Sequence, residues 1–112
     1  MGVEEKNCVP CQVGAAVMGV DEAKKMLEPL HHWVLVEDGT RIRREFKFRN
    51  FRKALEWVNQ VGELAEEQGH HPDIQLGWGY VIIDVMTHKI NGLHENDFIL
   101  AAKINAIGGV DE

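Results

Sequence analysis

The chain has 112 residues, a hydrophobic content of 45% and a formal net charge of −6, which together are typical of one globular domain with a single core. The acidic balance argues against a nucleic-acid partner, because binding to a phosphate backbone requires a basic surface. The nearly uncharged stretch 7–20 lacks the basic start of a signal peptide, and no stretch is apolar over the length of a membrane span. The default location is therefore the cytoplasm.

Residues 1–20 are predicted to form a flexible leader that carries Cys8 and Cys11 as a single Cys-x-x-Cys motif. Three interpretations of this motif stay open: a reduced leader without a site, a metal site completed by a histidine or by another subunit, and a redox pair. The domain itself is expected over residues 21–107, and residues 108–112 are expected to form a tail.

The first elements of the domain are predicted from hydrophobic periodicity and turn residues. A short helix over residues 20–30 is expected, with Asp21 as its N-cap. Two strands, over residues 33–37 and 41–48, follow with alternating apolar and polar positions. The dipeptide Asp38-Gly39 between them is a strong hairpin signal, so these strands are expected to pair.

The second half of the domain is predicted to contain a helix, two strands and a final helix. Asn50 is expected to cap a long helix over residues 51–68, whose apolar residues recur at helical spacing, and Gly69 is expected to end it in the left-handed conformation. Strands over residues 73–78 and 80–87 follow. The chain then closes with a helix that runs from about residue 94 to residue 106.

The predicted order of elements indicates the fold class. After the first helix it reads strand, strand, helix, strand, strand, helix, which favours a four-stranded antiparallel sheet with helices packed on one face. The expected class is α+β, a two-layer sandwich. The opposite face of the sheet would carry Ile82 and Met86 without cover, so an oligomer is expected.

The tripeptide His70-His71-Pro72 places two imidazoles at the junction between a helix and a strand. A residue before proline is held in extended geometry, so His71 is expected to lie at the corner that leads from the helix into the strand. Glu66 lies four residues before His70, and this spacing is expected to place its carboxylate on the same helical face, where it can orient the His70 ring. Antiparallel pairing of the last two strands is expected to bring His88 toward both.

Three converging histidines allow either a metal site or acid/base catalysis. Adjacent residues in an extended chain point to opposite sides, so His70 and His71 are poor joint ligands for one metal ion. Histidine is the side chain that can both donate and accept a proton near neutral pH. The pattern therefore favours acid/base chemistry.

The spacing of Glu66, His70-His71-Pro72, Trp78, His88 and Asp97 resembles the signature of the pterin-4a-carbinolamine dehydratases. The strand at Trp33, the sequence Phe46-x-Phe48-x-Asn50-Phe51 that leads into the long helix and the Thr87-His88 dipeptide are also similar to this family. The resemblance covers roughly residues 21–107, and the number of fixed intervals makes it specific.

The resemblance implies that the protein removes water from 4a-hydroxytetrahydropterin to give quinonoid dihydropterin, which recycles the cofactor of aromatic amino acid hydroxylases. It implies no metal and no organic cofactor, a small-molecule pterin substrate, and a homodimer or homotetramer. Two alternatives are a non-catalytic dimerisation module and a pterin-handling protein linked to molybdopterin metabolism.

The family pattern also implies roles for individual residues. His70 and His88 are expected to be the acid/base pair. The remaining candidates are expected to bind or position the substrate, with Trp33 against the flat pterin ring: His71, Pro72, Thr87, Asp97, Glu66 and Trp33. Asp97 has a second interpretation, as an acidic residue in the first turn of the last helix, where the helix dipole favours it.

Overall fold

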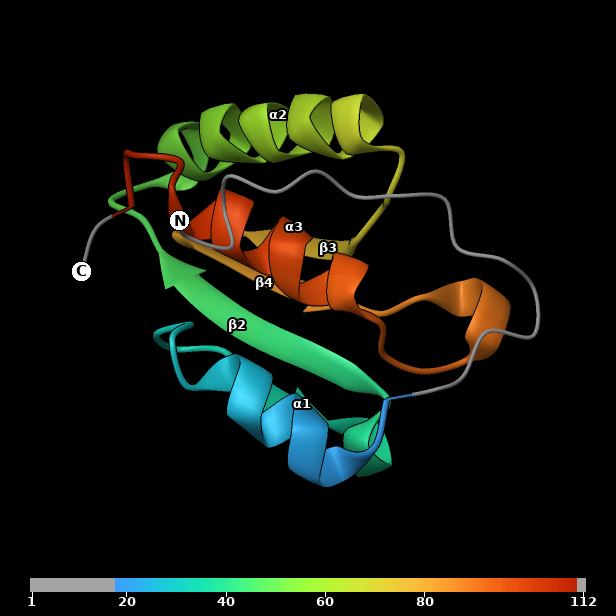
Figure 1. Cartoon of the computed structure of the whole chain (residues 1–112). Helices are drawn as coiled ribbons and strands as arrows, with labels where there is room; N and C mark the ends of the chain where they lie inside the picture. The colour runs from blue at the N-terminus through green and yellow to red at the C-terminus, as the bar shows by residue number, and fades with distance from the viewer. Residues whose placement is uncertain (1–17, 111–112) are drawn as a thin grey trace.

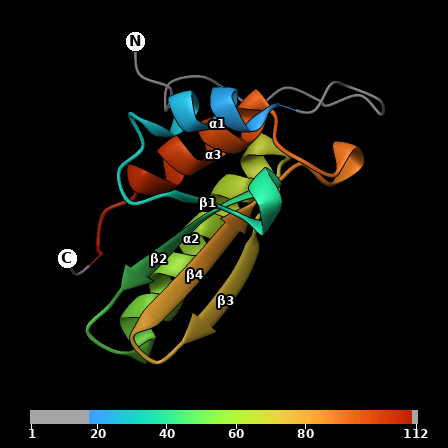
Figure 2. The same ribbon diagram turned by 90° about the horizontal axis from the view of Figure 1, so that it is seen from below.

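The computed structural model describes residues 18–110, so Cys8 and Cys11 of the predicted leader lie outside the described residues. The elements in chain order are α1 (Val20–Leu27), β1 (Val34–Val36), a 3-10 turn η2 (Glu37–Gly39), β2 (Arg41–Lys47), α2 (Phe51–Gln68), β3 (Asp73–Gly77), β4 (Tyr80–Val85), a 3-10 turn η3 (His88–Ile90) and α3 (Glu95–Asn105). All four strands pair antiparallel in the order β1-β2-β4-β3. Figure 1 shows β2, β4 and β3 of this sheet, and Figure 2 labels all four strands. Within residues 18–110, no helix is long and apolar enough to cross a bilayer.

The core lies between the sheet and its helices. Phe46 of β2 is paired with Val81 of β4, and Ile42 is paired with Val85, so these side chains share one face of the sheet. All of them are buried, and Trp57 of α2 packs into the same cluster. Figure 2 shows α2 running along the sheet. The predicted α+β two-layer fold is confirmed.

Helix α2 has the bounds that the sequence predicts. The Asn50 side chain accepts a hydrogen bond from the Lys53 backbone N–H at 2.9 Å, which caps the helix, and Gly69 ends it with φ 64°. The residues that face the core recur at helical spacing: Ala54, Trp57, Val61 and Ala65. The amphipathic pattern and its two end signals therefore agree with the structure.

Two predicted boundaries in the N-terminal part are wrong. Helix α1 follows Gly19 as its N-cap, so Asp21 lies in the first turn, and it ends at Leu27 shortly before Pro29, which has no N–H to continue it. The predicted two-residue turn after β1 is a 3-10 turn, η2, in which three successive residues have positive φ. Thr40 closes η2, because its hydroxyl and its N–H both donate to the Glu37 carbonyl oxygen.

The predicted fourth strand is too long. Strand β4 ends at Val85, and beyond it Thr87 forms an isolated bridge with Gly92, with mutual backbone hydrogen bonds of 2.9 and 3.4 Å. The chain between them forms η3, so His88 begins a 3-10 turn instead of ending a strand. The bridge between Thr87 and Gly92 takes the chain out of the sheet, so the strand ends two residues earlier than alternation alone indicates.

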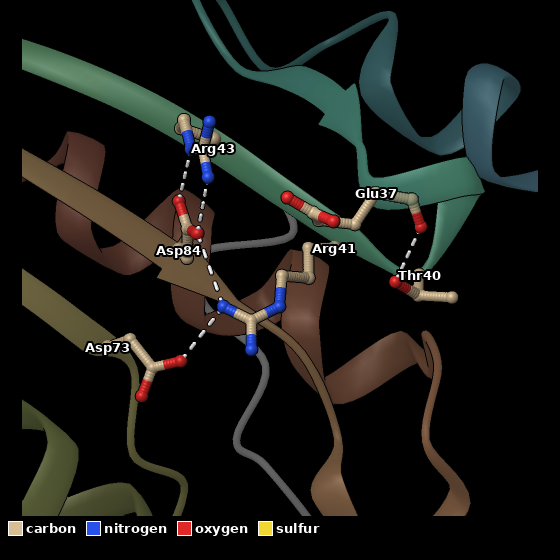
Figure 3. Close-up of polar contacts among 6 residues, drawn as sticks. All are labelled: Glu37, Thr40, Arg41, Arg43, Asp73 and Asp84. Atoms are coloured by element: carbon tan, nitrogen blue, oxygen red, sulfur yellow. Dashed lines mark hydrogen bonds and ion pairs between the residues drawn. The ribbon is translucent and has the colours of Figure 1, made fainter.

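The outer face of the sheet carries charges. Arg43 donates two hydrogen bonds to Asp84, at 2.6 and 2.8 Å, and Arg41 bridges Asp84 and Asp73 at 3.2 and 3.0 Å (Figure 3). The Arg43 hydrogen bond holds the pKa of Asp84 below its ordinary value, and Asp84 in turn raises the pKa of Arg43. Of the two apolar residues expected on this face, Met86 is buried, which corrects the expectation, and Ile82 is half-buried beside these charged side chains.

Candidate active site

The end of α2 determines where the two adjacent histidines lie. Gly69 is in the left-handed conformation, its N–H donates to the Glu66 carbonyl at 3.3 Å, and the His70 N–H donates to the Ala65 carbonyl at 3.2 Å. These two bonds form a Schellman motif, which satisfies the last carbonyls of the helix and reverses the chain direction. His70 is thereby carried off the helical face, and His71 leads through Pro72 into β3.

The start of α3 supplies the second half of the site. His94 is the N-cap, and its Nδ1 accepts from the Asn96 N–H at 3.2 Å. The Asp97 carboxylate, in the first turn, accepts from the His94 backbone N–H through Oδ2 at 2.8 Å. This reciprocal pair satisfies N–H groups that have no partner inside the helix, which explains why an acidic residue stands here.

Asp97 joins three elements at one carboxylate. Its side chain is fully buried, Oδ2 also accepts from the Thr87 hydroxyl at 2.8 Å, and Oδ1 lies 2.6 Å from His70 Nε2. Three segments therefore meet at this residue: the residues that follow β4, the start of α3 and the loop after α2. The His70 side chain is only 12% exposed, so most of its ring is covered by the protein and Nε2 faces inward to the carboxylate.

The expected pairing of Glu66 with His70 is wrong. Glu66 contacts His71 instead, with Oε2 at 2.5 Å from Nε2, and both side chains are largely exposed. The reason is the left-handed Gly69, which ends the helix before His70, so the four-residue helical spacing no longer applies. Each adjacent histidine thus has its own carboxylate: a buried one for His70 and a solvated one for His71.

The other predicted residues divide into those near this pair and those away from it. Thr87 is part of the buried cluster and Pro72 follows His71 directly. His88 is the next residue after Thr87, but it is exposed, and within residues 18–110 its ring forms no hydrogen bond or ion pair. No group of three potential metal-ligating side chains exists in the part of the chain that the structure describes.

Trp33 is not brought to this cluster. It is 5% exposed, packs edge-on against Phe46 with ring centroids 6.1 Å apart, and donates its indole N–H to Asn105 Oδ1 at 2.8 Å. Asn105 is the last residue of α3, whereas Asp97 lies in its first turn, about 12 Å away along the helix axis. The expectation that Trp33 lies against a pterin ring is therefore replaced by a role in the core.

A buried cation, Arg44, lies at the same end of α3 as Asn105. The Arg44 guanidinium donates to the same Asn105 oxygen at 2.7 Å and lies 4.2 Å from the centre of the Phe46 ring. Burial lowers the pKa of Arg44. Sequence alternation places Arg44 on the core face of β2, but a buried cation beside Asn105 is not signalled by any motif.

His94 contributes to the site through its backbone, because its N–H donates to Asp97 Oδ2 and holds this oxygen in place. This agrees with the second interpretation of Asp97, as an acidic residue in the first turn of the last helix. The available signal was the pairing of a cap position with an acidic residue three positions later, which is a known pattern at helix starts.

Comparison with known proteins identifies the family. The sequence profile of the family described as pterin 4 alpha carbinolamine dehydratase matches residues 17–107. The chain belongs to this family. A protein of Halorhodospira halophila, named provisionally as a pterin-4-alpha-carbinolamine dehydratase, is 55% identical over 96% of this chain and 99% of its own length. A protein of Methylococcus capsulatus with the same provisional name is 50% identical over 91% and 90%.

Solved structures agree with this assignment. The crystal structure of a transcriptional coactivator/pterin dehydratase from Brucella melitensis has a TM-score of 0.76 and 32% identity, and it covers 81% of this chain and 97% of that one. A pterin dehydratase-like protein identified as a RuBisCO assembly factor in the alpha-carboxysome has a TM-score of 0.59 and 26% identity, with coverages of 68% and 88%. Members of the family thus carry names for more than one function.

Proposed function

We propose that this chain dehydrates 4a-hydroxytetrahydropterin to quinonoid dihydropterin, with histidine side chains as the acid and the base. The observation that carries the proposal is the contact between His70 and the fully buried Asp97, at 2.6 Å. The other ring nitrogen of His70 forms no hydrogen bond within residues 18–110. A histidine that is bound to a buried carboxylate at one nitrogen and has a second nitrogen without a protein partner is the arrangement that general acid/base catalysis uses.

The carboxylate determines which nitrogen of His70 is available. An ionised carboxylate can only accept hydrogen bonds, so Nε2 of His70 carries the proton that is shared with Asp97 Oδ1. The neutral ring then has its lone pair on Nδ1, which is the nitrogen that takes a proton from the substrate. The imidazolium that forms is stabilised by the Asp97 charge, as in other histidine–carboxylate pairs.

The reaction balances with one proton taken and one delivered. His70 Nδ1 removes the proton from N5 of the pterin, the C4a–O bond breaks as the C4a=N5 bond forms, and the leaving hydroxyl receives a proton and departs as water. We assign the delivered proton to His88, which follows Thr87 of the buried cluster and is exposed to solvent. Solvent exchange returns both rings to their starting states.

His71 and Glu66 are assigned to substrate binding. Their contact leaves His71 Nδ1 free to hydrogen-bond a polar edge of the pterin, and the ring is 61% exposed, so a ligand can reach it. Pro72 fixes the direction in which His71 enters β3. Thr87 is assigned a positioning role through Asp97, because its hydroxyl donates its hydrogen bond to the carboxylate.

The test compares single alanine variants by steady-state turnover of synthetic 4a-hydroxytetrahydropterin, corrected for the spontaneous reaction. His70→Ala and His88→Ala should lower kcat by roughly 10²–10⁴-fold, the contribution expected of a proton-transfer group. His71→Ala should mainly raise KM, because it removes binding that the ground and transition states share. His31→Ala, an exposed histidine in the loop before β1, is the matched control. Wild-type kcat in both His70→Ala and His88→Ala would refute the catalytic proposal.

We further propose that the protein assembles into a dimer through the edge of β3. Strand β3 is an edge strand of the sheet. Its first three residues are all exposed, and they include Ile74. Exposed strand edges offer unpaired backbone groups to a second copy. The other edge strand, β1, has only three residues and therefore offers fewer such groups.

Assembly is tested by sedimentation of two matched variants at micromolar concentrations. Ile74→Lys places a charge on the edge strand β3, and Val34→Lys places the same charge on the other edge strand, where Val34 is exposed as well. The first should give monomers and the second should leave the mass of the wild type unchanged. A wild-type mass that is monomeric at every concentration would reject the proposal.

A further inference from the structure

The turn between β3 and β4 holds a tryptophan ring out in solvent. Trp78 is 71% exposed, the largest exposed fraction among the large apolar side chains that the structure describes. The Phe48 N–H donates to the Gly79 carbonyl at 2.8 Å, which ties the turn to the end of β2. The Tyr80 ring lies so close to Gly77 that a Cβ atom on this glycine would clash with it. A well-supported turn therefore presents the exposed indole.

Within one chain, Trp78 lies far from the histidine cluster. His71 and Pro72 precede β3, whereas Trp78 follows its last residue, Gly77. A strand rises about 3.3 Å per residue, so the chain from Pro72 to Trp78 spans roughly 20 Å. Trp33, which the sequence suggests as a wall for the flat substrate, is buried in the core. Neither of these two rings reaches a substrate beside His71 of the same chain.

The free edge of β3 has the features of a strand that pairs with a second copy. Residues 74–83 contain no charged side chain, so this edge lacks the lysines that commonly keep exposed strands apart. Ile74 and Leu76 pair with core residues of β4 and therefore lie on the helix side of the sheet, yet Ile74 is 37% exposed and Leu76 is only half-buried. Figure 2 shows β3 at the border of the sheet.

The composition of β3 favours one register for such a pair. A two-fold axis perpendicular to the sheet makes the two strands antiparallel and keeps the helices of both copies on one face. The register that overlaps all of Asp73–Gly77 places Gln75 opposite Gln75 of the second copy. Ile74 of each copy then lies opposite Leu76 of the other, so the exposed Ile74 side chains are covered by apolar neighbours.

The same register brings the turn of one copy to the histidines of the other. Trp78 of the second copy falls opposite Pro72 and therefore beside His71. The His71 side chain is 61% exposed and that of Glu66, which contacts it, is 75% exposed, so this place is open in a single chain. An exposed indole and an exposed imidazole thus meet across the dimer.

We propose that the substrate site is completed across this dimer, with Trp78 of one copy as an aromatic wall beside His71 of the other. The inference rests on the proposed dehydration and on the proposed β3 dimer. A pterin ring is flat and conjugated, and such rings stack on the face of an indole. Stacking is common to the ground and transition states, so Trp78 binds the substrate and leaves the proton transfers to His70 and His88.

Binding is tested with biopterin, an oxidised pterin without a 4a-hydroxyl group, by titration of its own fluorescence. Trp78→Leu retains apolar area at the edge but loses the aromatic ring, so it should raise the Kd roughly tenfold, and Trp78→Phe should restore most of the affinity. Ile74→Lys, which separates the copies, should show the same loss although its own Trp78 is intact. Combining Ile74→Lys with Trp78→Leu should add no further loss. Val34→Lys on β1 is the matched control and should bind as the wild type does.

Mixed dimers show whether Trp78 acts in the other copy. His70→Ala and Trp78→Leu chains are coexpressed with different affinity tags, and dimers that contain one chain of each are isolated. If Trp78 acts across the dimer, one site has both native residues and the other has neither, so the wild-type KM and about half of the wild-type kcat are expected. If it acts within its own chain, the site that retains His70 lacks the tryptophan, and KM should be raised.

Three results would overturn the inference: a raised KM in the mixed dimers, a wild-type Kd in Trp78→Leu, or a wild-type Kd in monomeric Ile74→Lys. The proposed activity fails in a different way. Wild-type kcat in both His70→Ala and His88→Ala would refute the catalytic roles, whereas the Kd for biopterin would still report on Trp78.

Discussion

The replacement Asp97→Asn tests the reasoning about the histidine site most directly, because it changes one atom in a fully buried carboxylate. Oδ2 accepts from the Thr87 hydroxyl and from the His94 N–H, both at 2.8 Å, and Oδ1 faces His70 Nε2 at 2.6 Å. An asparagine must place its NH₂ group at one of these two positions. If it replaces Oδ2, it confronts two donors, and if it replaces Oδ1, it confronts only one.

The second arrangement costs less, and it has a catalytic consequence. An NH₂ group at the Oδ1 position donates to Nε2, so the His70 proton moves to Nδ1. The lone pair that takes the substrate proton in the proposed mechanism is then lost. We therefore expect kcat to fall by roughly 10²–10⁴-fold. The hydrogen bonds of Thr87 and His94 are retained, so the unfolding free energy should fall by only about 1 kcal/mol, which corresponds to roughly 4–8 °C in Tm.

Two variants separate this effect from a general loosening of the site. Thr87→Val removes one donor to Asp97 but leaves the His70 contact, so it should lower Tm by a similar amount and kcat by less than about tenfold. His94→Ala retains the backbone N–H that holds the carboxylate, so its effect on kcat should be small. Turnover of synthetic 4a-hydroxytetrahydropterin and thermal unfolding are measured on all three variants. Wild-type kcat in a folded Asp97→Asn protein would refute the tautomer argument.

Three further predictions concern stability and metal dependence. Because Arg43 holds the pKa of Asp84 low, this ion pair stabilises the fold above pH 4 or so, and the contribution is lost as the pH falls through the lowered pKa. Asp84→Asn should therefore lower the unfolding free energy in urea at pH 7 and have little effect near pH 2. Asn105→Ala leaves two buried donors, from Trp33 and Arg44, without their acceptor and should cost roughly 2–4 kcal/mol by the same measurement. Prolonged EDTA treatment should leave the dehydration rate unchanged, and a loss that zinc alone restores would contradict the acid/base mechanism.

The predicted bounds of an element are correct where its local sequence signals and its packing in the fold favour the same residues. The 51–68 helix has an N-cap, an amphipathic stripe and a terminating glycine, and all three signals indicate the same bounds that the structure shows. Alternation continues through residues 86 and 87, so the sequence predicts a fourth strand that is longer than β4. Its end is determined by the bridge from Thr87 to Gly92, which joins residues whose contact no local pattern reports.

The histidine cluster shows the same limit at the level of single side chains. The sequence placed Glu66, His70 and His71 near one another correctly, but it assigned the carboxylate to the wrong imidazole. Helical spacing relates Glu66 to His70 only while the helix continues, and Gly69 ends it one residue too early. The true partner of His70 lies 27 positions away, where antiparallel packing and the start of α3 bring it into contact.

The two interpretations of Asp97, a helix-capping acid and a member of a polar site, turn out to be parts of one arrangement. Its Oδ2 satisfies the backbone at the start of α3, and its Oδ1 is thereby aimed at His70. A side chain that caps a helix has little rotational freedom, because the N–H it serves belongs to the rigid backbone. Rigidity is what a positioning carboxylate needs, since proton transfer is sensitive to small misplacement of the ring. The stability of the helix start and the orientation of the proposed base therefore depend on the same hydrogen bonds.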